Sequence, residues 1–473
     1  MAELEQFDLV GLADAIADGR LSARDVTGWS LQRLDSAGRR LNAVFRIDHD
    51  AAMARAAELD EMQVRRGVCG PLHGVPLAHK DLFQVAGREC HCGSTILRGR
   101  KADRTSYALA QLDAAGQVNA GSLHMAEFAL SPTGFNGHYG SALNPWNTEH
   151  VCGGSSSGSG VAVAARLVFG SLGSDTAGSI RMPAAMCGVT GLKTTFRRIS
   201  AEGCVPLSAS LDSMGPIAQT ARDCARLLTH ASHPNLSDGL CTRVPHQDYE
   251  AALDGDMTGI RIGIPDEYFR SDLDPQVGAA LEASLGVLRR LGARIVPASV
   301  PDMERINALA RVLMTVEAAT LHRRWIAAQP DAYSAQVRAR IEEGFAYSAV
   351  RYAEALSLRR RIADEFLRTA FANCDVLHVP ALTMQVPTIR ETTEGEPSAI
   401  LPKIARITHT ARGINYLGLP AISVPAGFST SGLPLAFQLV GKPFAEALLL
   451  RAADAYQRET DWHRRIPPTL KPA

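Results

Sequence analysis

The segment 152–191 constrains the fold of this chain most strongly, because it combines the composition of a linker with the apolar content of a protein interior. Glycine and serine dominate the segment, and neither residue type stabilises a core by side-chain burial. A flexible linker would be polar throughout, yet this segment contains the apolar runs 161–165 and 180–184. We therefore predict that it is packed inside the protein, close to a ligand, with a helix over 161–169.

The rest of the chain alternates between helical and strand patterns. Residues 1 to about 70 and 302–372 are predicted to be helical, the latter with only Gly344 and Pro330 as interruptions. A further helix is expected over 277–291. Short apolar runs predict strands at 260–264, 293–296, 376–379, 421–424 and 435–439. This alternation indicates an α/β protein.

Composition excludes some functional classes. The 473 residues, 46% of them hydrophobic, can bury a large core in one or more domains. Lys plus Arg and Asp plus Glu number 49 each, so the formal net charge is zero. Such a chain has no long-range field to attract nucleic acid or an anionic membrane. We therefore expect a small or uncharged substrate, no nucleic-acid partner and no membrane partner.

The N-terminus and the cysteines predict a cytoplasmic protein without a metal. Residues 1–8 lack the basic and apolar regions of a secretory signal, and no apolar stretch approaches the ~20 residues that span a bilayer. The nine scattered cysteines do not form a disulfide framework. Cys90-His91-Cys92 is too tightly spaced for a zinc site and lacks a second pair of ligands. No metal and no other cofactor is predicted.

Ser179 is the candidate nucleophile. It follows Thr176-Ala-Gly178, whose N–H groups can converge on an oxyanion, where one donor contributes about 3–4 kcal/mol. A serine hydroxyl needs a base, and a lysine can serve if burial keeps it neutral. Lys80 follows the apolar residues 75–78, which favours an interior strand. The pattern leaves open the alternative of a lysine at a strand end with its ammonium group in solvent.

Several different motifs are distributed along the whole chain. They are Gly74-Val-Pro-Leu-Ala-His-Lys-Asp81, the segment 128–146, Gly153-Gly-Ser-Ser-Ser-Gly-Ser159, Gly173-Ser-Asp-Thr-Ala-Gly-Ser-Ile-Arg-Met-Pro-Ala184, Cys187-Gly-Val-Thr-Gly-Leu-Lys193, Ser210-Leu-Asp-Ser-Met-Gly-Pro216 and Gly418-Leu-Pro-Ala-Ile-Ser-Val-Pro425. The set closely resembles the amidase signature family of Ser–cisSer–Lys amidohydrolases, and the resemblance covers roughly residues 5–465.

The resemblance implies the fold. The expected architecture is a large mixed β-sheet covered by helices on both faces. One amidase domain would span residues 1–473, with an N-terminal helical segment to about 70 and a signature core over about 70–230. The helical segment of about 302–372 would shape the substrate site.

The resemblance also implies the chemistry. Ser179 would form an acyl-enzyme, Ser155 would bridge to the base after a cis peptide bond, and neutral Lys80 would accept the proton. The remaining residues would support this triad. The N–H groups of Thr176, Ala177, Gly178 and Ser179 would form the oxyanion hole, Ala129 would line the substrate site, Ser156 would hydrogen-bond around Lys80, and Asp175 and Arg181 would brace the loop. A plain surface ion pair is the alternative for Asp175 and Arg181.

Ala177 departs from the commoner family pattern, which has glycine at that place. If the position required a positive φ, alanine would be strained by about 1 kcal/mol. Relatives acting on urea-like and carbamate-like substrates also have alanine there, so the resemblance implies a small carboxamide, carbamate or urea-like substrate.

Two alternatives compete with this assignment. The segment 154–158 also fits the G-x-S-x-G elbow of α/β-hydrolases, with Ser156 as nucleophile, but the polar residues 144–150 cannot form the buried strand that must precede it. The second alternative is the glutaminase A subunit of a glutamyl-tRNA amidotransferase complex. Arg340 matches an arginine of that group, yet 307–317 lacks its tyrosine and 403–416 lacks the acidic residue that a zwitterion requires.

Specificity is expected to come from residues 125–140, 302–372 and 387–402. These segments are rich in Met, Phe, Leu, Ile and Tyr, which predicts an apolar acyl or aryl group. The expected partners are therefore a small-molecule amide and water. A homodimer is also compatible with the sequence.

Overall fold

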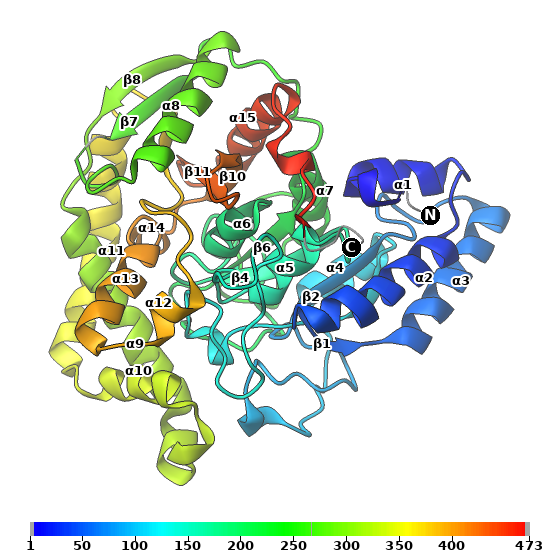
Figure 1. The fold of residues 1–473 in the computed structure, drawn as a ribbon, viewed down its shortest axis with the longest axis horizontal. Helices are drawn as coiled ribbons and strands as arrows, with labels where there is room; N and C mark the ends of the chain where they lie inside the picture. Colours follow the sequence, from blue (N-terminus) through cyan, green and yellow to red (C-terminus); the bar gives the residue numbers. More distant parts are fainter. Residues whose placement is uncertain (1–3, 266, 469–473) are drawn as a thin grey trace.

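A mixed β-sheet forms the centre of the computed structural model, which describes residues 4–265 and 267–468 (Figure 1). Its strands lie in the order β4 (Gly170–Asp175), β6 (Ser213–Ala218), β5 (Thr190–Lys193), β10 (Ala421–Phe428), β11 (Pro434–Gly441), β9 (Val376–Pro380), β7 (Arg261–Pro265) and β8 (Arg294–Ala298). Pairing is antiparallel from β4 to β9 and parallel from β9 to β8. This mixed sheet confirms the predicted fold class.

A smaller sheet carries the candidate base. Its order is β1 (Val44–Ile47), β3 (Val118–Leu123) and β2 (Pro76–Lys80), with β2 parallel and β1 antiparallel to β3. Every residue of β2 is buried, and β2 packs against β4 of the large sheet. Strand β1 was not predicted, because its four residues are all only half-buried and show no alternation of polar and apolar positions.

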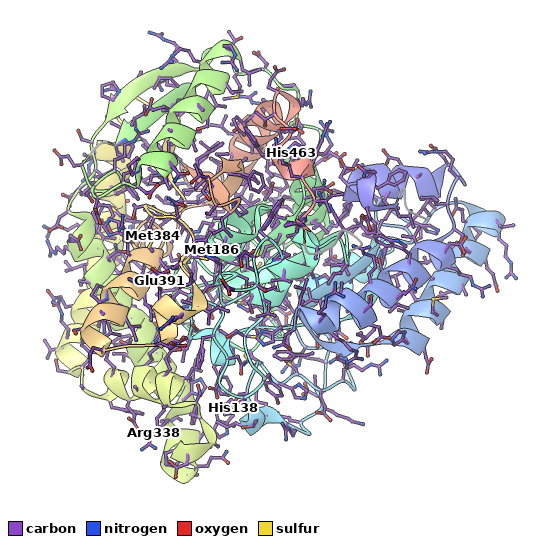
Figure 2. All side chains as sticks on the ribbon, in the orientation of Figure 1. His138, Met186, Arg338, Met384, Glu391 and His463 are labelled. Carbon is purple, nitrogen blue, oxygen red and sulfur yellow. The ribbon has the colours of Figure 1, made fainter. Side chains whose placement is uncertain are left out.

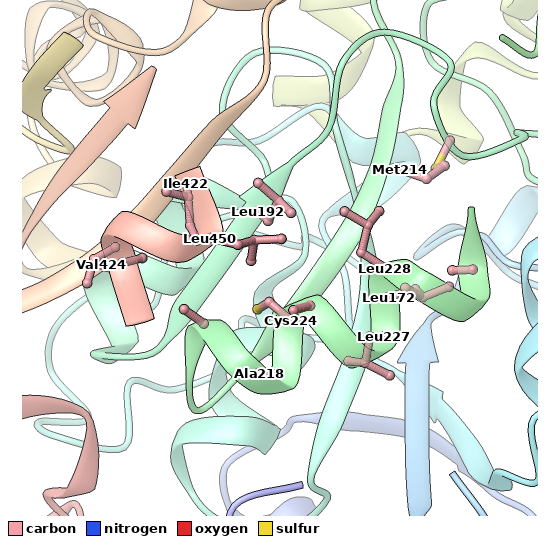
Figure 3. Close-up of a cluster of buried hydrophobic side chains, with 14 of the residues drawn as sticks. Leu172, Leu192, Met214, Ala218, Cys224, Leu227, Leu228, Ile422, Val424 and Leu450 are labelled. Carbon is pink, nitrogen blue, oxygen red and sulfur yellow. The ribbon is translucent and has the colours of Figure 1, made fainter. Parts of the chain in front are cut away.

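Helices cover both faces of the large sheet. One face is covered by α5 (Ser157–Ala164) and α6 (Arg181–Cys187), and the opposite face by α7 (Ala221–Ala231), α8 (Pro275–Arg290) and α15 (Glu446–Arg458). Figure 3 shows Leu172 and Leu192 of the sheet meeting Leu228 of α7 and Leu450 of α15. Helices on both faces of the sheet agree with the predicted architecture.

The remaining helices flank the sheets on two sides (Figure 1). On the N-terminal side are α1 (Leu9–Ala17), α2 (Ala23–Arg33), α3 (His49–Arg66) and α4 (Tyr107–Ala114), and on the other side are α9 (Met303–Ala328), α10 (Ala335–Phe345), α11 (Ala349–Ala370), α12 (Ile389–Thr393), α13 (Pro397–Thr408) and α14 (Arg412–Leu417). The helical prediction over 302–372 is confirmed, with breaks at 329–334 and 346–348. Within residues 4–265 and 267–468, no helix combines the length and the apolar character needed to cross a membrane.

Local sequence explains where several helices begin. Helix α7 begins after Thr220, which forms a capping box with Asp223. Helix α8 begins with Pro275 after Asp274, whose carboxylate accepts hydrogen bonds from two N–H groups of the first turn. These signals place α8 within two residues of its predicted start at 277.

The glycine- and serine-rich segment is packed, as predicted. Every residue from 151 to 195 is buried. Its first helix, α5, begins and ends earlier than the predicted 161–169, and β4 follows from Gly170. Helix α6 was not predicted, since its seven residues include Pro183, although proline is tolerated in a first turn.

Candidate active site

Lys80 lies buried at the end of β2, which excludes the alternative of an ammonium group in solvent. Its side chain has 0% exposure, and Nζ lies 2.7 Å from Ser155 Oγ and 2.8 Å from Ser174 Oγ. Burial lowers the pKa of Lys80 to about 7, although nearby acidic groups such as Asp212 and Asp175 act in the opposite direction. A lysine with this pKa is largely neutral at slightly alkaline pH and can accept a proton.

Ser155 is held tightly between neighbouring segments. The Gly154–Ser155 peptide bond is cis, and the Ser155 carbonyl accepts a hydrogen bond from Ala126 N at 3.1 Å. A Cβ atom at Gly154 would lie 2.5 Å from the carbonyl oxygen of Ser131 and 2.5 Å from Gly134 N. Only glycine therefore fits immediately before Ser155.

Ser179 lies between β4 and α6, at the wall of a cavity. Its carbonyl accepts a hydrogen bond from Ser156 N at 3.3 Å, which joins the two serine segments. The side chain is nearly buried, with 5% exposure. The structure thus brings Ser179, Ser155 and Lys80 into one region, with Ser179 facing the cavity and the other two behind it.

The N–H groups after β4 differ in availability. Gly178 N donates to Asp175 Oδ1 at 2.7 Å, so the Gly178 N–H group predicted for the oxyanion hole is already engaged. Within the described residues, the N–H groups of Thr176, Ala177 and Ser179 make no hydrogen bond, which leaves three donors for an oxyanion. The residue with positive φ is Gly178, at 114°, and not Ala177, so the strain considered for alanine is absent.

Asp175 and Arg181 form a buried brace and not a surface pair. Their side chains have 0% and 2% exposure, with Arg181 Nε 3.0 Å from Oδ2 and Nη2 3.0 Å from Oδ1 of Asp175. Arg181 also donates to Asn415 and Gln438, which anchors the loop to α14 and β11. Burial would raise the pKa of Asp175, but Arg181 holds it well below its usual value.

Removing this brace is expected to destabilise the protein strongly. Arg181→Ala would leave the buried Asp175 carboxylate without its partner, which costs about 3–5 kcal/mol of unfolding free energy. Denaturant unfolding followed by circular dichroism measures the loss. Arg338→Ala, which removes a surface arginine paired with Glu342, is the control and should change little. Equal effects of the two substitutions would contradict a stabilising brace.

Ser174, and not Ser156, is the second hydroxyl beside the lysine. Ser156 was predicted to hydrogen-bond around Lys80, but its Oγ donates to the Ser174 carbonyl at 3.3 Å instead. Ser156 immediately precedes the first turn of α5, whereas Ser174 lies on β4, which packs against β2. The only sequence signal for Ser174 is a polar side chain on a fully buried strand, which requires a hydrogen-bond partner.

Asp212 is a second residue that the sequence did not single out. Its Oδ1 accepts a hydrogen bond from Thr176 Oγ1 at 2.6 Å, and its Oδ2 accepts from the N–H groups of Leu207 and Ser208. Burial raises the pKa of Asp212. The carboxylate therefore ties the start of the oxyanion segment to the loop before β6. Its position in the 210–216 motif was the available signal.

A cavity of about 600 Å³ adjoins Ser179. Besides the segment after β4, Met182 and Leu207, three groups of residues line it, from the turn after β3, from α9 and α10, and from α13 and α14. They include Ala129, Leu130, Ser131 and Pro132, then Arg311, Met314, Thr315, Gln336, Ala339, Arg340 and Glu343, then Leu401, Pro402, Ile404, Ala405, Thr408 and Arg412. Ala129 lines the cavity, and its contact with substrate stays a prediction. Of the predicted specificity loop 387–402, only residues 401 and 402 line the cavity. The rest of this part of the wall comes from residues 404–412, in α13 and α14 and between them.

The cavity wall is mostly apolar and also contains charged groups. Met182, Leu207 and Met314 provide apolar surface, but three arginines also line the wall. Arg311 pairs with Glu343, with Nε and Nη2 each 2.9 Å from a carboxylate oxygen. The predicted apolar acyl or aryl group stays a prediction, for a site that also contains charged groups.

The described residues contain no group of three or more His, Cys, Asp and Glu side chains arranged to hold a metal ion. All nine cysteines, Cys90 and Cys92 among them, are free thiols. Burial raises the pKa of Cys92 above its ordinary value, so this thiol is protonated. Activity without metal remains a prediction.

Comparisons with known proteins identify the family of the chain. The Amidase family matches residues 25–450. The chain is 36% identical to the A subunit of glutamyl-tRNA(Gln) amidotransferase from Pseudomonas putida, over 98% of this chain and 99% of that protein. A solved protein described as part of a vestigial complex revealing the origins of an s-triazine catabolic enzyme has TM-score 0.90 and 32% identity, over 96% of this chain and 98% of that one. Peptide amidase from Stenotrophomonas maltophilia has TM-score 0.85 and 30% identity, over 98% of each chain.

These relatives contradict the predicted partners. We expected only a small amide and water, without nucleic acid, because the net charge is zero. The similar Pseudomonas protein is named as one chain of an enzyme acting on tRNA. Net charge describes the far field of a whole chain and does not report a local surface or a partner protein that binds the nucleic acid.

The family match and the structural similarities cover almost the whole chain, and the fold agrees with both. The serine hydrolase predicted from the sequence is thereby supported at the level of reaction class. The chain belongs to the amidase signature family and is a hydrolase of carbon–nitrogen bonds.

Proposed function

We propose that the chain hydrolyses the C–N bond of a small carboxamide, carbamate or urea-like compound through an acyl-enzyme on Ser179. The observation that carries this proposal is the contact of buried Lys80 with Ser155, 2.7 Å apart, directly behind the nucleophile segment. A neutral amine in this place can deprotonate a serine, which a surface lysine cannot do.

The proton moves along the three side chains in both directions. Ser179 Oγ attacks the substrate carbonyl carbon while its proton passes to Ser155, which gives its own proton to Lys80. The N–H groups of Thr176, Ala177 and Ser179 stabilise the oxyanion. When the C–N bond breaks, the proton returns through Ser155 to the leaving nitrogen. Water then cleaves the acyl ester by the same route and releases the acid.

A second candidate is the glutaminase A subunit of a glutamyl-tRNA amidotransferase. The observation that favours it is 36% sequence identity to a protein of that name, over 98% of this chain and 99% of that protein. In this case the substrate is glutamine, and the chain acts with tRNA and a partner protein. The cavity wall argues against this candidate. Among the described residues that line it, Glu343 is the only one with a carboxylate, and this carboxylate is already paired with Arg311. An ammonium group of glutamine would have no free countercharge there.

Three amides of matched length distinguish the two candidates: pentanamide, glutaramate and glutamine. Glutaramate replaces the terminal methyl group of pentanamide by a carboxylate, and glutamine adds an α-ammonium group to glutaramate. Ammonia release is measured for each, with and without glutamyl-tRNA(Gln). A preference for pentanamide or glutaramate of at least about tenfold supports the general amidase, since an unpaired ammonium group costs about that much. Preference for glutamine, increased by the tRNA, establishes the glutaminase instead.

A further inference from the structure

Asp212 is buried behind the oxyanion segment, where it binds two residues of the cavity wall. Its Oδ1 accepts a hydrogen bond from Thr176 Oγ1 at 2.6 Å, and its Oδ2 accepts from Leu207 N at 2.9 Å and from Ser208 N at 3.0 Å. Thr176 and Leu207 line the cavity beside Ser179, and Asp212 has 3% exposure. Asp212 therefore acts on the site through the residues that it binds.

The loop that carries Asp212 is fixed to two long helices. Glu317 of α9 accepts hydrogen bonds from the hydroxyl groups of Ser208 and Ser210 and from Ser210 N. Arg359 of α11 donates to the carbonyl oxygen of Ser210 at 2.6 Å. Because this network leaves the loop little freedom to move, a carboxylate on the loop can hold a neighbouring segment in place.

Thr176 supplies the first N–H group available for the oxyanion. It follows β4 directly, and its hydrogen bond to Asp212 restricts rotation of the side chain and, through it, of the adjoining backbone. An oxyanion donor must lie about 2.7–3.1 Å from the oxygen, and a displacement of about 1 Å can lower the rate about 100-fold. The negative charge of Asp212 opposes an oxyanion nearby, so the carboxylate assists this donor by position and not by charge.

The charge of Asp212 acts instead on the base. The ionisable groups that raise the pKa of Lys80 are Cys92, Asp212, Asp175 and Cys204. Burial raises the pKa of both thiols, so they are neutral at neutral pH. The carboxylate of Asp175 is paired with Arg181, whereas Asp212 is hydrogen-bonded by uncharged donors, with Arg197 acting on it as a nearby charge. Of these two anions, Asp212 is thus the one whose charge is less offset.

We infer that Asp212 is a positioning residue for the reaction, which holds Thr176 and its oxyanion donor in place through the Thr176 hydroxyl. The inference rests on the proposed function and adds to it a residue that is buried behind the cavity wall. The charge has a second effect, because the ionised carboxylate favours the protonated form of Lys80 and so delays the appearance of the neutral base as the pH rises. Different substitutions separate the two effects.

Substitution of Thr176 tests the positioning role. Thr176→Val keeps the shape of the side chain and the charge of Asp212 but removes the hydroxyl that Asp212 holds. With any amide that the wild-type enzyme cleaves, kcat is expected to fall about 10- to 100-fold and KM to stay within about threefold, because the oxyanion donor acts in the transition state. Thr176→Ser keeps the hydroxyl and should retain kcat within about threefold. Thermal unfolding shows whether each variant folds.

Asp212→Asn tests the effect of the charge. The amide has nearly the size of the carboxylate, and its Nδ2 can donate to Thr176 Oγ1 while its Oδ1 accepts from an N–H group. Loss of the negative charge lowers the pKa of Lys80, so the acid limb of log kcat/KM should move to lower pH by about half a unit or more. Thr176→Val should leave this limb in place. Loosened packing alone would admit water to Lys80 and move the limb to higher pH, because burial is what lowers this pKa.

A surface carboxylate with similar partners is the control. Glu391 also accepts hydrogen bonds from a threonine hydroxyl and an N–H group, both of Thr388, at an exposed position of α12 (Figure 2). Glu391→Gln should change neither kcat nor the acid limb.

Two results would overturn the inference. One is that Thr176→Val retains kcat within about twofold of Thr176→Ser. The other is that Asp212→Asn leaves the acid limb unchanged or moves it to higher pH. If Asp212→Asn does not fold, the comparison of the two Thr176 variants decides. Neither result affects the role of Ser179, because the loss of hydrolysis in Ser179→Ala is measured independently. Failure of this inference and failure of the proposed function are therefore distinguishable.

Discussion

Ser179→Ala is expected to lower kcat for amide hydrolysis by about 10⁴- to 10⁶-fold. The variant keeps the oxyanion donors and the cavity wall but has no atom that can form the acyl-enzyme. Alanine is smaller than serine and keeps the same backbone hydrogen bonds, so the folded state should persist. Ammonia release measures the loss, and intact-mass spectrometry shows whether an acyl group still accumulates on the enzyme.

A matched surface substitution controls for nonspecific effects. Ser36→Ala removes an exposed hydroxyl that only donates within its own helical turn, and activity should be unchanged. Thermal unfolding of both variants shows whether either is damaged. If Ser179→Ala retains turnover within tenfold of the wild-type enzyme, another residue is the nucleophile.

The second large effect concerns the base. Lys80→Ala is expected to reduce kcat by about 10³- to 10⁵-fold, because Ser155 loses the group that takes its proton. Lys80→Arg should be equally inactive, since guanidinium does not release a proton in a protein. The comparison of the two variants separates a requirement for positive charge from a requirement for a neutral amine.

The pH profile follows from the same residue. Burial lowers the pKa of Lys80 to about 7, and its deprotonated form is the one that accepts a proton. Activity is therefore lost as the pH falls below about 7 and is fully developed above it. A plot of log kcat/KM against pH should rise with a slope of about one below this value and then level off. A profile that instead falls as the pH rises through 7 would contradict a neutral lysine base.

His79 provides the matched control for Lys80. The two residues are adjacent on β2 but contact different groups: His79 Nε2 lies 3.0 Å from Gln117 Oε1, and Nδ1 accepts from Leu172 N. Burial lowers the pKa of His79 to about 4. His79→Ala should thus retain catalysis if it folds, and an inactive His79→Ala beside an active Lys80→Arg would mean that histidine is the base.

The sequence predicted the parts of the fold that have strong local patterns. The long helices within 302–372 and the strands β7, β9, β10 and β11 were expected within a few residues of their bounds, because apolar periodicity continues through each of them. Strand β1 and helix α6 were missed because they are short and held by tertiary contacts. The division into a single domain stays a prediction.

Within the site, the candidate catalytic residues were easier to predict than the residues that surround them. Lys80, Ser155 and Ser179 belong to distinctive motifs, whereas Ser174 and Asp212 act through contacts between segments far apart in the chain. Arg412 was missed for the same reason. A net charge of zero sums the whole chain, and no local pattern indicates that positions 340 and 412 line one cavity.

The walls of the cavity have a consequence for how such an enzyme changes its substrate. The nucleophile, its base and the oxyanion donors all lie between residues 80 and 179, whereas the arginines of the wall lie between 311 and 412. Substitutions in the second half can therefore retune the charge and shape presented to the substrate while the reacting atoms stay in place. A chimera that joins this N-terminal half to the C-terminal half of a related amidase would be expected to inherit its chemistry from one parent and its selectivity from the other.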